Sequence, residues 1–153
     1  MSDIDFDSTM RKTMLQKKMA GLILPFGMHI RSSLFPSELD YFRNNPHTAG
    51  MAADDNYVIL NPYSSLSQQE LASVANNEAA RLYMRQSGFR PSFTVTDEQR
   101  RLFARTPYEH DEQALRDTIA ARLFSGDPSA LNGTSEQLEF VSQLRQRNMG
   151  KTE

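Results

Sequence analysis

Residues that interrupt regular structure recur along most of this chain, and they limit the length of every helix and strand that it can form. The breakers between residues 36 and 128 are Pro36, Asn45-Pro46, Asn61-Pro62, Pro91, Pro107 and Asp127-Pro128. Proline lacks an amide donor, and it disfavours helical geometry in the residue before it. The spacing of these breakers therefore predicts short elements joined by turns.

Helix starts are indicated by Ser/Thr residues followed three positions later by Glu or Gln. The pairs are Ser67 with Glu70, Thr96 with Gln99, Thr106 with Glu109, and Thr134 with Gln137. In this pattern the two side chains satisfy free amides at a helix N-terminus reciprocally. We expect helices near residues 67–86, 97–105, 107–124 and 135–148. Gly88 and Gly126 stand where C-terminal caps need a positive φ.

The best strand candidate is the aromatic and branched run Tyr-Val-Ile-Leu at residues 57–60. Its partner is either residues 50–53 or residues 93–95, and the sequence leaves that choice open. The fold class is mainly α, with four to five short helices, at most a small β-hairpin and an N-terminal arm. At 153 residues the chain has the length of one domain. We place the arm at residues 1–35 and a single helical domain at residues 36–150.

The first 35 residues differ from the rest because they are rich in methionine and carry several basic side chains. They allow two interpretations. One is a helix that packs on the chain's own core, since methionine fills irregular gaps. The other is an arm that docks on another subunit through adaptable methionine contacts flanked by basic side chains. In the second case the partner-binding residues are Met10, Met14, Lys17, Lys18, Leu22 and Phe26.

Composition excludes several classes of function. The net charge of -2 gives no overall field that would attract nucleic acid or a membrane surface. The absence of cysteine excludes disulfides, thiolate metal sites and cysteine nucleophiles. The apolar run at residues 20–28 is interrupted by Pro25 and Gly27, and it is shorter than the ~20 residues that a membrane span needs. We therefore expect no membrane segment, no secretory signal and no nucleic-acid partner.

The stretch Asn77-Glu78-Ala79-Ala80-Arg81 has the frame of the zinc-protease motif H-E-x-x-H, but both histidines are missing. Two imidazoles four residues apart supply the metal ligands in that motif, and neither Asn77 nor Arg81 replaces one. One interpretation is a degenerate zincin-like scaffold without metal. The other makes Glu78 and Arg81 structural polar residues, with the carboxylate paired to Arg81, Arg85 or a basic residue of another helix.

A second acidic stretch, Glu109-His110-Asp111-Glu112, falls in the first turn of the helix expected from residue 107. Acidic groups are favourable there because they meet the exposed amides and the positive end of the helix dipole. Metal binding is a weaker interpretation, since only the side chains of Glu109 and Glu112 share a face. His29 and His47 lie far apart in the sequence, and no glycine-rich phosphate loop occurs. We expect no catalytic residue, no cofactor and no metal site, and therefore no enzyme.

Several stretches together carry a resemblance to a known group of proteins. They are Phe42-Arg43-Asn44-Asn45-Pro46-His47-Thr48-Ala49-Gly50-Met51, Val58-Ile59-Leu60-Asn61-Pro62-Tyr63-Ser64, Asn77-Glu78-Ala79-Ala80-Arg81-Leu82-Tyr83-Met84-Arg85, Glu112-Gln113-Ala114-Leu115-Arg116, Ile119-Ala120-Ala121-Arg122 and Ser125-Gly126-Asp127-Pro128-Ser129. Over residues 42–130 the chain resembles small uncharacterised proteins encoded by tailed bacteriophages. That group has no assigned activity, so the resemblance implies a phage origin and a place in the virion, without functional residues.

These observations together predict a non-enzymatic bacteriophage structural protein that is made in the host cytoplasm and becomes part of the virion. It would act by forming homo-oligomers or by docking onto other virion proteins of the head, neck or tail. One alternative is a small phage regulator that binds and inhibits a host enzyme. The other is the metal-free zincin-like scaffold, which would also be a binding module.

Overall fold

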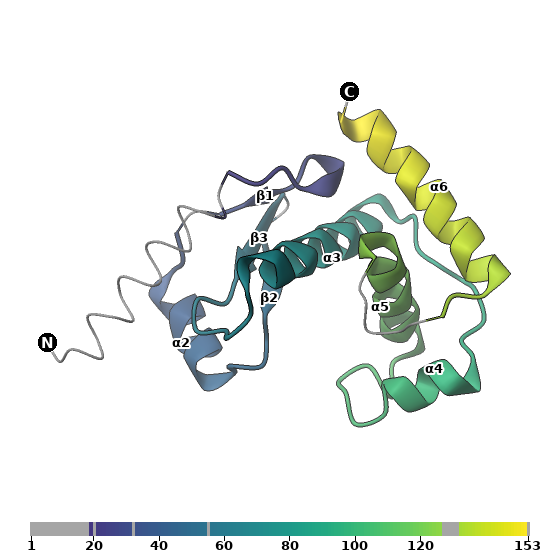
Figure 1. The fold of residues 1–153 in the computed structure, drawn as a ribbon, viewed down its shortest axis with the longest axis horizontal. Coiled ribbons are helices and arrows are strands. Elements are labelled where there is room, and N and C mark those ends of the chain that lie inside the picture. Colours follow the sequence, from purple (N-terminus) through teal and green to yellow (C-terminus); the bar gives the residue numbers. More distant parts are fainter. Residues whose placement is uncertain (1–18, 20, 32, 55, 127–131, 153) are drawn as a thin grey trace, which may run out of the picture. The chain divides into compact units, whose positions relative to one another are not determined.

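The computed structural model describes residues 19–152, except residues 20, 32, 55 and 127–131. These residues form a mainly α-helical fold with a small three-stranded sheet, which confirms the expected fold class (Figure 1). The contacts divide the chain into two compact units, Met1–Ala79 and Ala80–Glu153. Helix α3 (Gln68–Ser87) runs through this boundary. Among the described residues, no helix has the length and apolar content that crossing a membrane requires.

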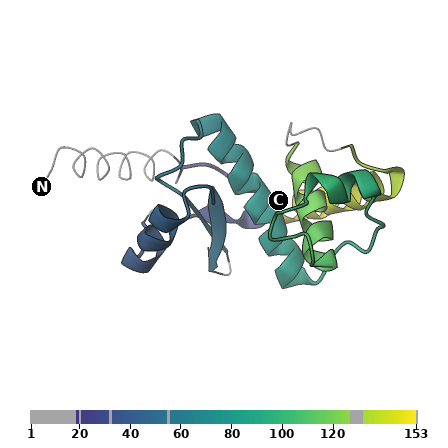
Figure 2. The same ribbon diagram turned by 90° about the horizontal axis from the view of Figure 1, so that it is seen from below.

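The sheet belongs to the first unit and has the order β1-β3-β2. Strand β3 (Tyr57–Leu60) pairs in parallel with β1 (His29–Ile30) and antiparallel with β2 (Gly50–Asp54). The strand expected at residues 57–60 is confirmed, and residues 50–53 are its hairpin partner. Three consecutive side chains of β3, from Val58 to Leu60, are buried, as a central strand requires. The same elements are seen from below in Figure 2.

The chain from Met19 to the end of β1 contributes several side chains to the core of the first unit. It contains a short 3-10 turn, η1 (Pro25–Gly27), in which Phe26 has a left-handed φ of 61°. The buried side chains are those of Met19, Leu24, Phe26, Met28 and Ile30. Leu22 is half-buried. The described part of the expected arm therefore packs on the chain's own core, and the remaining expected contact residues, Met10, Met14, Lys17 and Lys18, lie outside the described residues.

Helix α2 (Pro36–Asn44) begins at a proline, whose missing amide costs nothing at the first helical position. The Glu38 carboxylate accepts a hydrogen bond from the Phe35 amide at 2.7 Å, as in the second half of a capping box. Phe35 occupies the N-cap position and has no side-chain oxygen to complete the box. We expected no particular helix here because the usual N-cap signal is absent.

Three of the expected capping boxes are confirmed. Ser67 Oγ accepts from the Glu70 amide at 3.2 Å, and Glu70 accepts from the Ser67 amide at 3.1 Å. The same exchange occurs at Thr96 with Gln99, where helix α4 (Asp97–Leu102) begins. It recurs at residues 134 and 137, where helix α6 (Ser135–Thr152) begins. Local side-chain chemistry therefore determines where these helices start.

The prediction that a helix begins at residue 107 is wrong. Helix α5 (Glu112–Ser125) begins five residues later, and the side chain of Asp111 caps it by accepting from the Ala114 amide at 3.0 Å. Residues 103–110 form successive turns. Thr106 accepts from the Tyr108 amide at 3.3 Å, and Glu109 accepts from the Arg105 amide at 3.0 Å. Both side chains satisfy turn amides, so their spacing does not indicate a helix.

The C-terminal caps are as expected. Gly88 follows α3 with a φ of 75°, and Gly126 follows α5 with a φ of 69°. This left-handed geometry is strained for residues that carry a Cβ. The hydrophobic core of the second unit contains side chains from α5 and α6. They include Leu115, Ile119, Val141 and Leu144, each at most 1% exposed. The core of this unit also includes the segment that joins α3 to α4, which organises the candidate site.

Candidate functional site

Residues 91–96 cross the second unit as an extended segment without a partner strand. Pro91, Phe93 and Val95 are buried, whereas Ser92 and Thr94 are exposed. This alternation is typical of a strand with one face on a core. Because the segment belongs to no sheet, its backbone polar groups need other hydrogen-bond partners. Side chains of helices α5 and α6 supply them.

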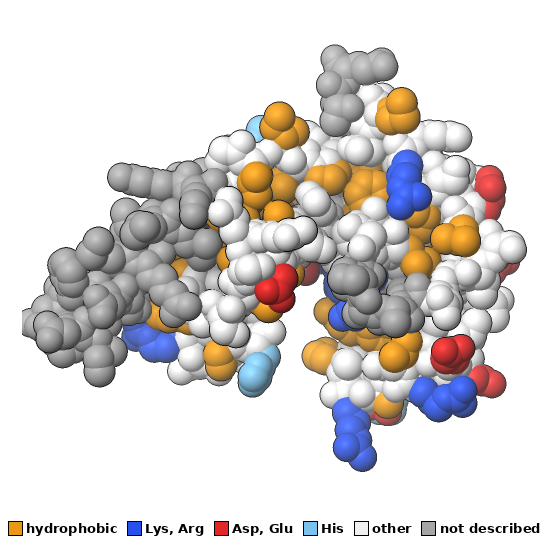
Figure 3. Space-filling model, viewed as in Figure 1, with side chains coloured by type: hydrophobic (Ala, Val, Ile, Leu, Met, Phe, Trp, Pro, Cys, Tyr) orange, Lys and Arg blue, Asp and Glu red, His pale blue; other side chains and the backbone are white. Residues whose placement is uncertain are grey.

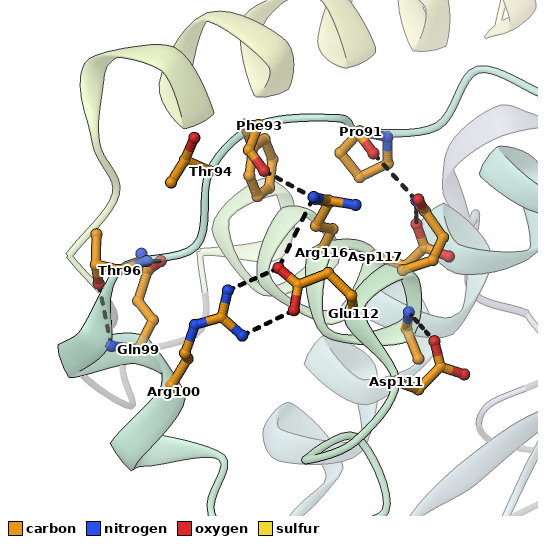
Figure 4. A network of polar contacts seen from close by, with 12 residues as sticks. Pro91, Phe93, Thr94, Thr96, Gln99, Arg100, Asp111, Glu112, Arg116 and Asp117 are labelled. Atoms are coloured by element: carbon orange, nitrogen blue, oxygen red, sulfur yellow. Dashed lines mark hydrogen bonds and ion pairs between the residues drawn. The ribbon is translucent and has the colours of Figure 1, made fainter.

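Two side chains of α5 hold the carbonyl groups of this segment (Figure 4). Gln113 Nε2 donates to the Pro91 carbonyl at 3.0 Å, and Arg116 Nε donates to the Phe93 carbonyl at 2.9 Å. Both donors lie on the same face of α5, since they are three residues apart. The helix therefore fixes the segment at two points two residues apart, which matches the repeat of an extended chain.

Two adjacent residues of α6 hold the segment from another side. Glu136 Oε1 accepts from the Thr94 amide at 2.7 Å, and Gln137 Nε2 donates to the Thr94 carbonyl at 3.0 Å. Both backbone groups of Thr94 are thus satisfied by side chains from one turn of helix. The Thr94 side chain remains exposed.

A reciprocal pair of buried amides links the N-termini of α4 and α6. Gln99 Nε2 donates to Gln137 Oε1 at 2.7 Å, and Gln137 Nε2 donates to Gln99 Oε1 at 2.8 Å. Each oxygen also accepts from a backbone amide of its own capping box, at Thr96 or Thr134. The second donor of Gln99 reaches the Asn132 carbonyl, and that of Gln137 reaches the extended segment. Both amides therefore use all of their donors and acceptors.

A pair of charged side chains links α4 to α5. Glu112 on α5 accepts two hydrogen bonds from Arg100 on α4, both at 2.7 Å, in the forked geometry that suits guanidinium and carboxylate groups. This hydrogen bonding lowers the pKa of Glu112 below its ordinary value and raises the pKa of Arg100. Arg116 lies 3.8 Å from the same carboxylate. Arg100 and Glu112 are twelve residues apart in the sequence, and their ion pair joins two separate helices.

A second ion pair anchors the beginning of the extended segment to α5. Arg90 is paired with the carboxylate of Asp117, whose side chain is only 10% exposed. Asp117 also accepts from Gln113 Nε2 at 3.0 Å. Gln113 thus connects the ion pair to the Pro91 carbonyl. These polar groups hydrogen-bond to one another and to the backbone of the extended segment.

A shallow depression of about 160 Å³ lies beside the extended segment. It is lined by Ser92, Phe93, Glu136, Glu139, Phe140 and Gln143. The Phe140 ring stacks on Phe89 at 4.9 Å and meets Phe93 edge-on at 6.0 Å. Small-molecule sites usually occupy about 300–1,000 Å³, so this depression has room for a single side chain.

The residues singled out from the sequence do not converge on one site. Glu78 and Arg81 are both half-buried on α3, and the Arg81 guanidinium lies 5.0 Å from the centre of the Tyr108 ring. His29 packs beside Tyr57, with the ring centres 5.9 Å apart. Among the described residues, no three histidine, aspartate or glutamate side chains are grouped as they would be around a metal ion.

The acidic stretch at residues 109–112 does not lie together in a first helical turn, which corrects our expectation. Glu109 closes a turn, Asp111 caps α5, and only Glu112 is in the first turn of that helix. His110 has a side chain that is 92% exposed. Some residues of the network in Figure 4, such as Thr96 and Gln99, were predicted from the sequence as members of capping boxes. Their contacts with residues of other helices were not predicted.

Comparison of the chain with protein-family models, with curated proteins and with solved structures gave no match. The functional interpretation therefore depends on the residues and contacts of this chain.

Proposed function

We propose that this chain is a non-enzymatic structural protein that acts through protein–protein contacts in the head, neck or tail of a bacteriophage particle. The observation that carries the proposal is the exposure of large apolar side chains on both units. They are Ile23 (92%), Phe35 (58%), Tyr41 (43%), Tyr57 (41%), Leu102 (52%), Leu138 (50%) and Met149 (65%). Figure 3 shows hydrophobic side chains at several places on one face of the molecule.

Two aromatic rings, the exposed Phe35 and the half-buried Tyr63, lie beside arginine side chains. The Arg31 guanidinium lies 4.4 Å from the centre of the Phe35 ring, and Arg43 lies 5.5 Å from that of Tyr63. Aromatic residues and arginine are the types that are enriched at protein interfaces. They also supply most of the residues that dominate binding energy, because they bury a large area at low conformational cost. This surface composition supports a role in contacts with other proteins.

The interior supports the same proposal. Its polar contacts include the buried amide pair of Gln99 with Gln137, which also reaches the Thr94 carbonyl, and the ion pair of Arg100 with Glu112. Such contacts keep helices and an extended segment in fixed positions, which is the property that a repeated building block needs. The place in a virion is supported by the resemblance over residues 42–130.

Mass spectrometry of purified phage particles tests this proposal. We expect peptides of this chain in washed particles, at an abundance comparable to that of other head or tail proteins. Particles without the chain, together with its recovery in complex with a host enzyme from infected cells, would favour the regulator instead. Sedimentation of the purified chain tests self-association separately, and we expect oligomers.

A further inference from the structure

Strand β2 has one hydrogen-bonding edge that the described part of the chain leaves unpaired. The sheet order β1-β3-β2 places β2 at the margin, and β3 is its only partner among the described strands (Figure 1). An unpaired edge offers a row of amide and carbonyl groups to another strand. The question is which groups point outward and what would pair with them.

The pairing with β3 determines which residues face outward. The Asn61 amide donates to the Ala49 carbonyl at 2.8 Å, so these two residues form a hydrogen-bonded pair. Hydrogen-bonded and non-hydrogen-bonded pairs alternate in an antiparallel ladder. Met51 opposite Ile59 is therefore hydrogen-bonded within the sheet, whereas the backbone groups of Gly50 and Ala52 point away from β3.

The other side of β3 agrees with this assignment. The Val58 carbonyl accepts from the Arg31 amide at 3.0 Å, so Val58 directs its backbone toward β1. Val58 is the residue opposite Ala52. Within the ladder formed by the described strands, the amide and carbonyl of Ala52 consequently have no partner and lie on the open edge.

We propose that two copies of this chain associate by antiparallel pairing of their β2 edges about a twofold axis at Met51. Gly50 of each copy then lies opposite Ala52 of the other, and both residues exchange amide and carbonyl hydrogen bonds. The outward groups of one edge are thus complementary to an identical edge, because the twofold axis maps residue 50 onto residue 52. This inference rests on the self-association included in the proposed function.

A second copy fits this edge better than a long strand does. The ladder is irregular between Ala52 and Asp54, which confines regular pairing to residues 50–52. A bulge of this kind prevents an edge from accepting a long strand, whereas a short symmetric pair closes on itself. Residues 50–53 carry no charge, so like copies meet without repulsion. The two Asp54 residues would lie six positions apart along the paired strands, about 20 Å at 3.4 Å per residue.

Proline substitutions at residues 52 and 51 test separately the amide that faces the open edge and the amide that bonds within the sheet. Ala52→Pro removes an amide that faces outward, and proline is tolerated on edge strands in that orientation. We expect Ala52→Pro to sediment as a monomer with the helical circular dichroism of the wild type. Met51→Pro is the matched control, because it removes an amide used inside the sheet and should lower the unfolding midpoint. An Ala52→Pro variant that folds and still forms the wild-type dimer overturns the proposal.

Cysteine cross-linking tests the register without proline. The chain contains no cysteine, so each variant carries a single thiol. In the proposed dimer the two residues 51 form a non-hydrogen-bonded pair with Cα atoms about 4.5 Å apart, which lies within disulfide range. Mild oxidation should convert most of Met51→Cys to a covalent dimer. Ala52→Cys, whose opposite residue is Gly50, should give at least tenfold less.

The outcomes separate this inference from the proposed function. Equal cross-linking of Met51→Cys and Ala52→Cys, or none in either, overturns the edge pairing. If the wild type still sediments as an oligomer in that case, self-association stands and uses another surface. A wild type that is monomeric at every concentration tested overturns both the edge pairing and the proposed self-association, while detection in particles would still support the virion role.

Discussion

Gln137 has a side-chain amide that is fully buried and hydrogen-bonded at every position. Gln137→Ala leaves groups of Gln99, Thr94 and Thr134 without their partners inside the second unit. We expect a loss of about 1–3 kcal/mol in the free energy of unfolding, which is the cost of stranding buried polar groups. Urea unfolding measures it.

The exposed capping box at the start of α3 provides the control for this prediction. Glu70 occupies the same position of its capping box as Gln137. Glu70→Ala removes a carboxylate that accepts from the Ser67 amide, but water can replace this acceptor because the box is exposed. We expect a smaller loss for Glu70→Ala. Combining Gln99→Ala with Gln137→Ala should cost less than the sum of the single variants, because the two residues interact directly. Additive losses would show that the buried amides are energetically independent.

Glu112 makes the stability of the second unit depend on pH. Hydrogen bonds from Arg100 lower the pKa of Glu112 in the folded chain. The carboxylate therefore stabilises the fold above the ordinary glutamate pKa of about 4.3, and this contribution is lost as the pH falls through the lowered pKa. Thermal melts should show Glu112→Gln below the wild type at pH 7, with the gap closing in acid.

Glu98, an exposed glutamate of α4, provides the comparison for this pH effect. Glu98→Gln, which removes an exposed carboxylate outside the Arg100 pair, should melt close to the wild type at pH 7. A gap between Glu112→Gln and the wild type that persists unchanged at low pH would mean that the effect does not come from the titration of this carboxylate.

At the scale of elements, the start of α5 is the point where the structure corrects the sequence. Because Asp111 is its N-cap, Asp111→Ala should cost about 1 kcal/mol, whereas Asp111→Asn keeps an acceptor and should cost much less. Chemical denaturation of both variants measures the difference. Thr106→Ala should cost less than Asp111→Ala, since no helix begins at residue 107. A larger loss of stability for Thr106→Ala than for Asp111→Ala would instead support a helix that begins at residue 107.

The elements that were predicted correctly are those specified by neighbouring residues. The strand at residues 57–60 and three helix starts depend on side chains within four positions of one another. Helix α2 escaped prediction because Phe35 occupies its N-cap position. Strand β1 has only two residues, so its existence depends on pairing with β3 and not on its own sequence. The spacing of Thr106 and Glu109 is the same in a sequence of turns as in a helix start.

The polar network was predictable only in its parts. The sequence predicts Gln99 and Gln137 as members of two capping boxes. The two residues are 38 positions apart, and no pattern of neighbouring residues indicates that their side-chain amides form hydrogen bonds with each other. The ion pair of Arg100 with Glu112 likewise depends on how α4 packs against α5. Conversely, Glu78 and Arg81 attracted attention through a motif frame that lacks its metal ligands. Both residues are half-buried on α3, and the Arg81 guanidinium lies over the Tyr108 ring.

At the scale of the whole molecule, truncation distinguishes the expected arm from the core. Removing residues 1–35 also removes β1 and the buried Leu24, Phe26, Met28 and Ile30, each worth about 1.5–3 kcal/mol of burial. We expect this truncated chain to lose the structure of its first unit, as measured by circular dichroism. A chain that begins at Met19 should stay folded.

Light scattering on the chain that begins at Met19 tests the remaining arm. If residues 1–18 dock on a neighbouring subunit, this chain should associate more weakly than the full-length protein. A fully folded chain after removal of residues 1–35 would contradict the packing described for the first unit. An unchanged oligomer after removal of residues 1–18 would show that they take no part in assembly.

The paired glutamines have a consequence for the timing of local motion. The Thr96 and Thr134 amides are each held by a glutamine oxygen, and the two glutamines hold each other. Displacing either glutamine from its helix start would also break the amide pair. Hydrogen–deuterium exchange should therefore show similar protection at Thr96 and Thr134, and Gln137→Ala should accelerate exchange at both. Two amides far apart in the sequence would then exchange through a single cooperative event.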